Sequence, residues 1–242
     1  MYRPVGDLTG KVVFITGANQ GIGLEAARAL HASGATVFLG VRDLDKGKAA
    51  VEDVKSSPDP SNQAPIPFIE LSLDSLESAR AAVKAFLAQS TKPNILILNV
   101  GVMATPEGRT KDGFETQFGV NHLGHFLLFT LLKSALLEAS TASFNSRVIS
   151  VSSVGHRLGG VRFHDFYFDQ EGSYQPWLAY GQAKTSNIYL ANEIERRYGS
   201  DGLHALSLHP GAIVTNLVQY MDESNLRVIL EGIDSGPLKN RM

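Results

Sequence analysis

Short apolar runs alternate with longer amphipathic segments along almost the whole chain. The apolar runs are rich in β-branched residues, and they predict strands at 11–16, 35–41, 66–71, 94–100, 147–152 and 203–209. The intervening segments repeat apolar residues at helical spacing, and they predict helices at 21–33, 45–56, 75–89, 113–139 and 178–199. Because nearly continuous apolar strands alternate with helices, the pattern predicts a parallel sheet covered on both faces. The fold class is therefore α/β, with a doubly wound sheet of six strands.

The same pattern bears on domain organisation. No linker or shift in composition divides the chain, so we expect one domain over 1–242, with a short substrate-side segment from about residue 212. No apolar strand-like run follows Ile233. The sheet is thus expected to stop at six strands, which leaves the last one, at 203–209, as an exposed edge.

Composition and charge exclude several classes of function. The net charge is −2 and the pI is near 6.4, so no basic field points to nucleic acid. The absence of cysteine excludes disulfides and thiol nucleophiles, and no His, Asp and Glu set has metal-ligand spacing, so we expect no metal. No stretch approaches the roughly 18 apolar residues of a membrane span, and no secretory signal is evident. We therefore expect a soluble, cytoplasmic protein without membrane insertion.

A glycine-rich loop, "TGANQGIG" at 16–23, lies where the first strand turns into the first helix. Gly17 suits a tight turn, while Gly21 and Gly23 remove side chains where backbone must approach a pyrophosphate at a helix N-terminus. The spacing departs from the G-x-G-x-x-G form. A left-handed turn that only packs helix against strand is the alternative.

The end of the second strand bears on the choice of dinucleotide. An NAD site needs an acidic residue there, whereas this chain reads "LGVRD", with Arg42 after the strand. A guanidinium suits the 2′-phosphate of NADP, and Asp43 lies one residue beyond, where it can cap the next helix. We therefore favour NADP(H) over NAD(H).

Six segments in order make the chain resemble the short-chain dehydrogenase/reductases, and within them the retinol-dehydrogenase-like carbonyl reductases. The resemblance runs from about Leu8 to Leu217. The segments are "TGANQGIG" (16–23), "LILNVGVM" (96–103), "NHLGHF" (121–126), "VISVSS" (148–153), "YGQAK" (180–184) and "HPGAIVT" (209–215). The resemblance implies a Rossmann-type fold and a small carbonyl or alcohol substrate.

The resemblance also assigns residues to roles. It implies a catalytic group of Asn121, Ser153, Tyr180 and Lys184. It implies a cofactor site built from Gly17, Asn19, Gln20, Gly21, Ile22, Gly23, Arg42, Ser72, Leu73, Asn99, Gly101, Tyr180, Lys184, Pro210, Gly211, Ile213 and Thr215. Within that site, Lys184 would hold the nicotinamide ribose and Thr215 the nicotinamide amide, while Asn121 would anchor a water that leads protons to Lys184.

The spacing of Tyr180 and Lys184 carries the chemistry. A lysine one helical turn away is expected to lower the pKa of the tyrosine, which could then exchange a proton with a carbonyl oxygen as hydride is transferred. Ser153 would hydrogen-bond the same oxygen, while Ser152 is expected to point the other way. We predict an NADP(H)-dependent oxidoreductase. The alternatives are a dinucleotide-binding protein without redox turnover and an enzyme of non-redox cyclisation or isomerisation.

The chain departs from the family pattern at three places. Leu98 and Val100 replace an asparagine and an alanine, and Ser72 replaces an aspartate that commonly bonds adenine. Each change is expected to weaken cofactor binding by about 1 kcal/mol without abolishing it. Only 25 residues follow Leu217, where the family normally continues through a further helix and a seventh strand.

Two further features leave questions about substrate and assembly. The segment between Ser153 and Tyr180 carries six aromatics, namely Phe163, Phe166, Tyr167, Phe168, Tyr174 and Trp177. They predict either a wall for a bulky apolar or aromatic substrate or a satellite hydrophobic cluster. The predicted helices at 113–139 and 178–199 carry more apolar residues than one face needs, and family members commonly pair through them, so we expect a homodimer.

Overall fold

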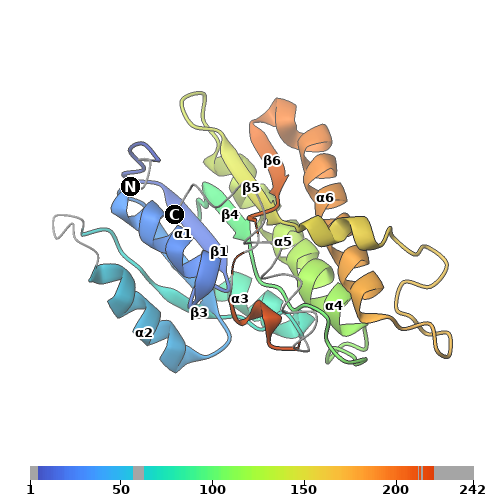
Figure 1. Cartoon of the computed structure of the whole chain (residues 1–242). Coiled ribbons are helices and arrows are strands. Elements are labelled where there is room, and N and C mark those ends of the chain that lie inside the picture. The colour runs from blue at the N-terminus through green and yellow to red at the C-terminus, as the bar shows by residue number, and fades with distance from the viewer. Residues whose placement is uncertain (1–4, 57–62, 212, 214, 221–242) are drawn as a thin grey trace, which may run out of the picture.

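The computed structural model describes residues 5–56, 63–211, 213 and 215–220. These residues form a single six-stranded sheet whose paired strands are all parallel, in the order β3-β2-β1-β4-β5-β6 (Figure 1). The strands are β1 Val12–Thr16, β2 Thr36–Val41, β3 Phe68–Glu70, β4 Ile95–Leu98, β5 Ser146–Val151 and β6 Leu203–Leu208. The strand order reverses between β1 and β4, the switch point at which such sheets bind ligands. The predicted α/β fold with a doubly wound sheet is confirmed.

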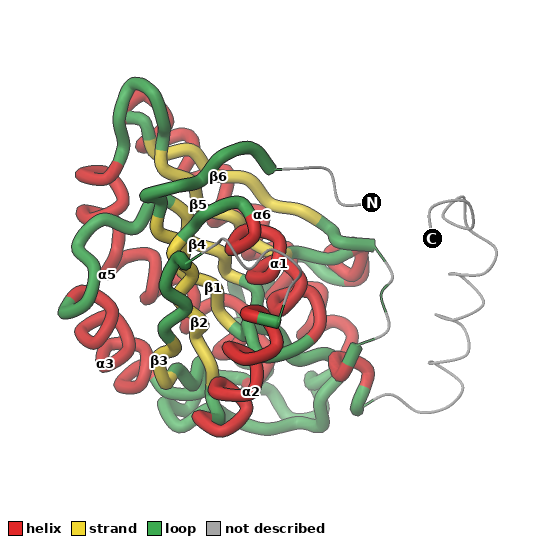
Figure 2. Tube along the Cα trace, turned by 90° about the vertical axis from the view of Figure 1, so that its left-hand side faces the viewer, coloured by secondary structure: helices red, strands yellow, loops and turns green. Residues whose placement is uncertain are grey.

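Helices cover both faces of the sheet. The longer ones are α1 Gly21–Ala32, α2 Leu44–Lys55, α3 Leu76–Leu87, α5 Gly124–Ala139 and α6 Pro176–Tyr198. Figure 2 shows α1 and α2 on one side of the strands and α3 and α5 on the other. The short elements are α4 Thr116–Phe118, the π-helical turn η1 Gly119–Leu123, and the 3-10 turns η2 Val154–Leu158, η3 Gly199–Asp201 and η4 Asn216–Val218.

Alternation along the strands divides the core into two layers. In β1, Phe14 packs into the cluster of α3, α5 and α6, while Val13 and Ile15 pack into the cluster of α1 and α2. In β4, Leu96 and Ile97 divide in the same way. Both faces of a central parallel strand are therefore apolar, which explains the continuous apolar runs in the sequence.

Several predicted boundaries shift for local reasons. The helix predicted at 113–139 begins at Thr116, because the backbone at 110–114 closes a turn and the Glu115 carboxylate caps the next N–H groups. The helix predicted at 178–199 begins at Pro176, after Gln175 caps it. The strands predicted at 66–71 and 94–100 shorten to β3 and β4. In the second case the backbone N–H groups of 99 and 100 bond the Thr16 hydroxyl instead of a neighbouring strand.

Two predictions concern the far end of the chain and the membrane. Strand β6 is the outermost strand of the described sheet, and Leu206 and Leu208 are exposed on it. Most of the predicted substrate-side segment after residue 212 lies outside the described residues.

Helix 116–139 is the one described segment long and apolar enough to cross a bilayer, with a mean hydropathy of 1.2. Its Leu128, Leu132 and Leu136 are fully buried against the sheet and α3.

Candidate active site

The glycine loop between β1 and α1 is tightly constrained at each of its glycines. Gly17 and Gly21 have positive φ angles of 68° and 54°, where a side chain would be strained. A Cβ on Gly23 would lie 2.4 Å from the Gly17 carbonyl oxygen and 2.6 Å from Asn99 Nδ2, so no side chain fits there. Asn99 Nδ2 also donates to the Thr16 carbonyl at 2.9 Å. The loop is therefore fastened to the end of β4 across the switch point.

The turn after β6 reaches the same loop. A Cβ on Gly21 would lie 3.2 Å from Thr215 Cγ2, and Asn216 Nδ2 donates to Gln20 Oε1 at 2.8 Å. Thr215 Oγ1 accepts from the N–H of Leu217 and so begins η4. Of the remaining predicted residues here, Asn19 and Ile22 are half-buried on the loop, Pro210 and Gly211 follow β6, and Ile213 is exposed.

The strand ends on the adenosine side differ in what they offer a ligand. Arg42 follows β2, is exposed, and makes no hydrogen bond or ion pair with any described residue, while Asp43 caps α2 as predicted. The Ser72 hydroxyl donates to the Asp74 carboxylate, which leaves its lone pairs free to accept. Leu73 is buried against Gly124. The guanidinium is thus free to bind an anion.

The four residues of the predicted catalytic group converge from three elements. Ser153 follows β5, and its hydroxyl accepts from the N–H of Gly155 at 3.1 Å. Its side chain also lies close enough to the phenol of Tyr180 on α6 to favour the charged form of that phenol. Lys184 Nζ lies 5.6 Å from the centre of the Tyr180 ring. A Cβ on Gly101 would be 3.4 Å from both Lys184 Nζ and Asn121 Oδ1, which places Asn121 beside the lysine. These contacts describe one small site next to the glycine loop.

The pKa values of Tyr180 and Lys184 correct the expectation that the lysine lowers the pKa of the tyrosine. Burial raises the pKa of Tyr180, opposed by the hydrogen bond from Ser153, whereas the sequence predicted a pKa lowered by Lys184. Burial also lowers the pKa of Lys184 to about 8. The reason is that both groups are nearly inaccessible to water, so neither charged form is favoured. In addition, the ammonium donates to the Val151 carbonyl at 3.1 Å instead of to the phenol.

The neighbouring serine has a different partner on α6. The Ser152 hydroxyl donates to the main-chain carbonyl of Lys184 at 2.8 Å. This bond ties α6 to the end of β5, while Ser153 lies beside the Tyr180 phenol.

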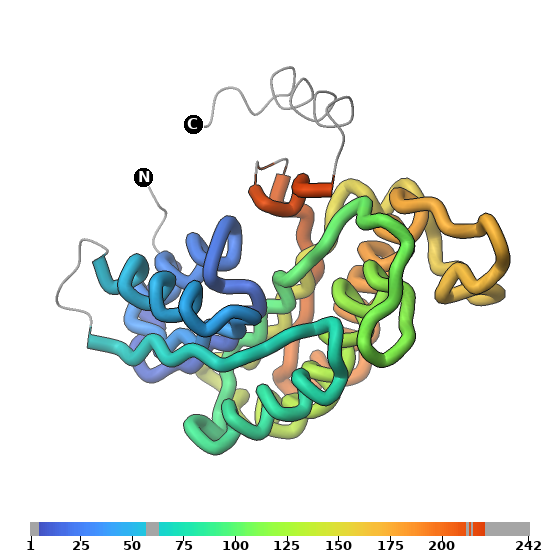
Figure 3. Tube along the Cα trace, turned by 90° about the horizontal axis from the view of Figure 1, so that it is seen from below, coloured from blue at the N-terminus to red at the C-terminus, as the bar shows by residue number. Residues whose placement is uncertain are grey.

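Most of the aromatic segment packs away from the site. The ring of Phe166 lies 5.9 Å from that of Phe118, and Tyr167 lies 5.3 Å from Phe114, while Phe168 is buried. Figures 1 and 3 place residues 159–175 on the side of the molecule opposite α1 and α2. These ring contacts are those of a satellite cluster over the start of the α4–η1–α5 helix, which is the second of the two alternatives.

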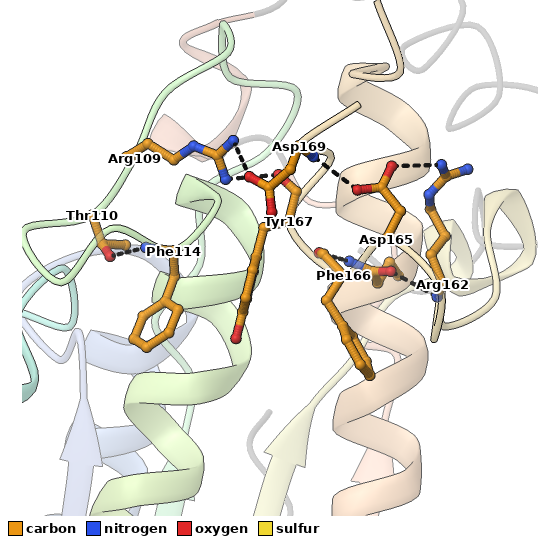
Figure 4. Close-up of polar contacts among 9 residues, drawn as sticks. Arg109, Thr110, Phe114, Arg162, Asp165, Phe166, Tyr167 and Asp169 are labelled. Atoms are coloured by element: carbon orange, nitrogen blue, oxygen red, sulfur yellow. Dashed lines mark hydrogen bonds and ion pairs between the residues drawn. The ribbon is translucent and has the colours of Figure 1, made fainter. Parts of the chain in front are cut away.

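Polar contacts fasten this segment to the chain before α4 (Figure 4). Arg109 donates to the Tyr167 carbonyl and to the Asp169 carboxylate, each at 2.8 Å. The Tyr174 hydroxyl donates to the Thr105 carbonyl at 2.8 Å. Trp177 is the exception among the aromatics, because its ring meets that of Tyr180 edge-on with centres 6.4 Å apart.

Sequence reasoning missed a buried polar network behind Asn121. Thr16, His125 and Asn187 are each almost fully buried and hydrogen-bonded to the residues around the site. The one available signal was the pair of histidines in "NHLGHF", which stand in an otherwise apolar helix. In the described part of the chain, no group of three or more His, Asp or Glu side chains is placed to hold a metal ion.

Comparison with known proteins agrees with this geometry. A family model described as short chain dehydrogenase matches residues 11–166. The chain is 48% identical over 223 residues to short-chain dehydrogenase/reductase prx1 of Penicillium roqueforti, covering 92% of this chain and 63% of that protein. It is 41% identical over 212 residues to retinol dehydrogenase 12 of Mus musculus, covering 88% and 64%. This chain therefore belongs to the short-chain dehydrogenase/reductase family, as its motifs predicted.

A solved structure supports the same assignment. An uncharacterized protein from Mycobacterium paratuberculosis is 38% identical, with a TM-score of 0.72 over 88% of this chain and 73% of that one. The chain spans less than two thirds of the length of the two curated relatives above.

Proposed function

We propose that the protein is an NADP(H)-dependent oxidoreductase that interconverts a carbonyl and an alcohol. The observation that carries the proposal is the contact of Ser153 with the Tyr180 phenol beside Lys184. Residues that follow β4 separate this group from the glycine loop. Bound NADP(H) would supply or accept the hydride. The family makes this chemistry the first hypothesis, and the residues of this chain fit it.

The cradle fits a dinucleotide in two respects. Gly101 adds no side chain beside Lys184 Nζ and Asn121 Oδ1, each of which lies 3.4 Å from the position its Cβ would take. The N–H groups at the start of α1, which no side chain caps, are available to bind pyrophosphate. Arg42, exposed and unpaired among the described residues, supports the preference for the 2′-phosphate.

The chain's own residues would then move and hold a proton. Tyr180 keeps its proton at neutral pH because its pKa is raised by burial, so it is the donor when a carbonyl is reduced. Ser153 would donate to the same oxygen as negative charge develops there. Lys184, with a pKa near 8 in the free protein, would gain charge on meeting the ribose hydroxyls and would then ease the loss of the tyrosine proton.

We propose a bulky apolar or aromatic substrate on narrower grounds than the sequence suggested. Trp177 is half-buried and its ring adjoins Tyr180, so it can pack against a substrate whose carbonyl reaches the phenol. The other aromatics of the segment do not contribute to this argument.

We also propose a homodimer formed by α5 and α6. Phe126 on α5 is 48% exposed and Tyr189 on α6 is 53% exposed, both on outer surfaces of those helices. Large apolar side chains exposed on two adjacent long helices favour a partner that covers them. Light scattering at micromolar concentration should give twice the chain mass, and a clean monomer would refute this.

Two variants test the reaction. Tyr180→Phe should bind NADPH as the unchanged protein does but lose at least about 1,000-fold in kcat, because only the acid–base proton is removed. Lys184→Ala should weaken NADPH binding and turnover together. NADPH titration and steady-state kinetics on an aldehyde, ketone and alcohol panel measure both. Retained turnover in Tyr180→Phe would exclude this proton donor.

Arg42→Ala tests the choice of cofactor. It should weaken NADPH binding roughly 10- to 100-fold and leave NADH binding nearly unchanged, since only the former carries the 2′-phosphate. Equal affinity of the unchanged protein for both cofactors would contradict the assignment to Arg42. Tight binding without turnover on the panel would favour the non-redox alternatives.

A further inference from the structure

His125 is a buried residue that has no role in the predicted catalytic group. It lies in the first turn of α5, directly after the π-helical turn that carries Asn121, and is 1% exposed. Its two ring nitrogens contact two different elements. Nδ1 lies 2.9 Å from the main-chain oxygen of Asn121, and Nε2 lies 2.9 Å from the hydroxyl of Thr16 at the end of β1.

These partners fix the tautomer of the ring. A carbonyl oxygen can only accept, so Nδ1 carries the hydrogen and donates to Asn121. Nε2 then holds a lone pair, and the Thr16 hydroxyl must donate to it. Burial lowers the pKa of His125 to about 3, against the opposing bond to Asn121, so the ring is neutral over the whole physiological range. The Ile97 carbonyl, at 3.4 Å, is the more distant acceptor for the Thr16 proton.

Because the Thr16 hydroxyl donates its hydrogen bond to His125, both of its lone pairs can accept hydrogen bonds from the residues that follow β4. It accepts from the N–H of Asn99 at 2.8 Å and from the N–H of Val100 at 3.1 Å. Thr16 immediately precedes Gly17, and the Asn99 side chain donates to the backbone of both. The position of the glycine loop against β4 therefore depends on the direction in which one hydroxyl points.

On the other side, His125 holds the turn at Asn121. The Asn121 side chain makes two bonds with a single residue, accepting from the N–H of Val102 at 2.8 Å and donating to its carbonyl at 2.9 Å. Asn121 Oδ1 and Lys184 Nζ flank Gly101. A shift of the Asn121 peptide would thus move the segment that separates the lysine from the glycine loop.

We propose that His125 is a positioning residue that locks the glycine loop and the Asn121 turn to each other through its two nitrogens. Its Nε2 contact fixes the loop for cofactor binding, and its Nδ1 contact fixes the turn beside Lys184 for turnover. The turnover part rests on the proposed function, whereas the binding part requires only that NADPH binds.

Two isosteric variants separate the contacts. His125→Asn places an amide N–H near the Nδ1 position and keeps the bond to Asn121, but it leaves Thr16 without its acceptor. His125→Gln places an amide oxygen near the Nε2 position and keeps the bond from Thr16, but it leaves the Asn121 carbonyl without its donor. His122→Asn is the matched control, because His122 is half-buried on the π-helical turn just before His125 and bonds Asn187 instead of Thr16.

The expected result is a crossed pattern. His125→Asn should weaken the NADPH Kd roughly tenfold with kcat nearly retained, and His125→Gln should lower kcat roughly tenfold with Kd nearly retained, each from one lost hydrogen bond. His122→Asn should leave the Kd within about twofold. A parallel loss of both parameters in both His125 variants, tracking a fall in Tm, would reduce His125 to a structural role and overturn the proposal.

A second readout works without cofactor or turnover. Amide hydrogen exchange should accelerate at Asn99 and Val100 in His125→Asn, and at Val102 in His125→Gln, because those N–H groups lose their ordered acceptors. Uniform acceleration in both variants, or none, would contradict the lock. A protein that shows the crossed exchange pattern but neither binds NADPH nor turns over would refute the proposed function alone.

Discussion

The glycine loop at 16–23 and the aromatic segment at 159–178 both follow strands of the same sheet, yet their sequences convey different amounts of information. Each glycine of the loop meets a backbone requirement, either a positive φ or a contact that no Cβ tolerates. The aromatics of the segment only need apolar partners, and the tertiary fold supplies these as Phe114 and as Phe118 of α4. Backbone requirements leave a local signature in sequence, whereas the partner of an aromatic ring is a long-range outcome.

The largest expected effect tests the loop. Gly23→Ala forces a methyl group to within 2.4 Å of the Gly17 carbonyl oxygen, and the loop must open. We expect the free energy of unfolding to fall by about 3 kcal/mol and NADPH binding to be lost. Gly160→Ala is the matched change on the aromatic side, where no atom lies within 4 Å of the added Cβ.

That control should stay within about 0.5 kcal/mol of the unchanged protein. Urea unfolding and NADPH titration measure both variants. Equal behaviour of the two alanines would show that the loop has no special backbone requirement.

The next effect concerns Lys184, whose Nζ lies 5.6 Å from the centre of the Tyr180 ring. Its pKa is about 8 in the folded protein and 10.5 ordinarily, so between these values the unfolded chain holds a proton that the folded chain does not. The stability of the cofactor-free protein should therefore rise with pH through this window, and this contribution is lost as pH falls through 8. The full effect is about 3 kcal/mol.

Lys184→Met should remove that slope while the remaining groups titrate as before. Urea unfolding of both proteins at intervals between pH 7.5 and 10.5 gives the difference. Parallel stability curves would mean that the lysine is solvated in the free protein.

The smallest expected effect comes from comparing two aromatic residues of the segment, Trp177 and Phe163. Trp177→Ala removes the ring beside Tyr180 and should raise KM for bulky carbonyl substrates roughly tenfold, with little change for small ones. Phe163→Ala, at a residue that is 75% exposed, should change neither KM nor stability measurably. Equal KM shifts in both variants would favour the wall of aromatics, the other alternative for this segment.

The sequence alone predicted those features of the fold that follow from local pattern. The six strands follow from periodicity, and the cap at Asp43 follows from one side chain's reach. The predicted helix start at residue 113 was wrong. The helix begins at Thr116, because the Glu115 cap and the turn before it override an amphipathic pattern that extends further back.

Two aspects of the candidate site could not be predicted from pattern. The pKa of Tyr180 depends on how deeply α6 buries both the phenol and Lys184, and spacing alone does not give that depth. His125 was missed because its partners, Thr16 and Asn121, lie 109 and four residues away, and only the fold brings the distant one into contact. Predicting either property requires the packing.

The central claim is that Tyr180, Ser153 and Lys184 serve hydride transfer at a bound nicotinamide. The most direct measurement uses NADPH deuterated at the transferable position, mixed with the protein and an aromatic aldehyde, with the alcohol analysed by mass spectrometry. The account predicts one deuterium in the alcohol with the unchanged protein and no labelled alcohol with Tyr180→Phe, although that variant still binds the cofactor. Unlabelled product, or labelled product in equal amount from both proteins, would contradict it.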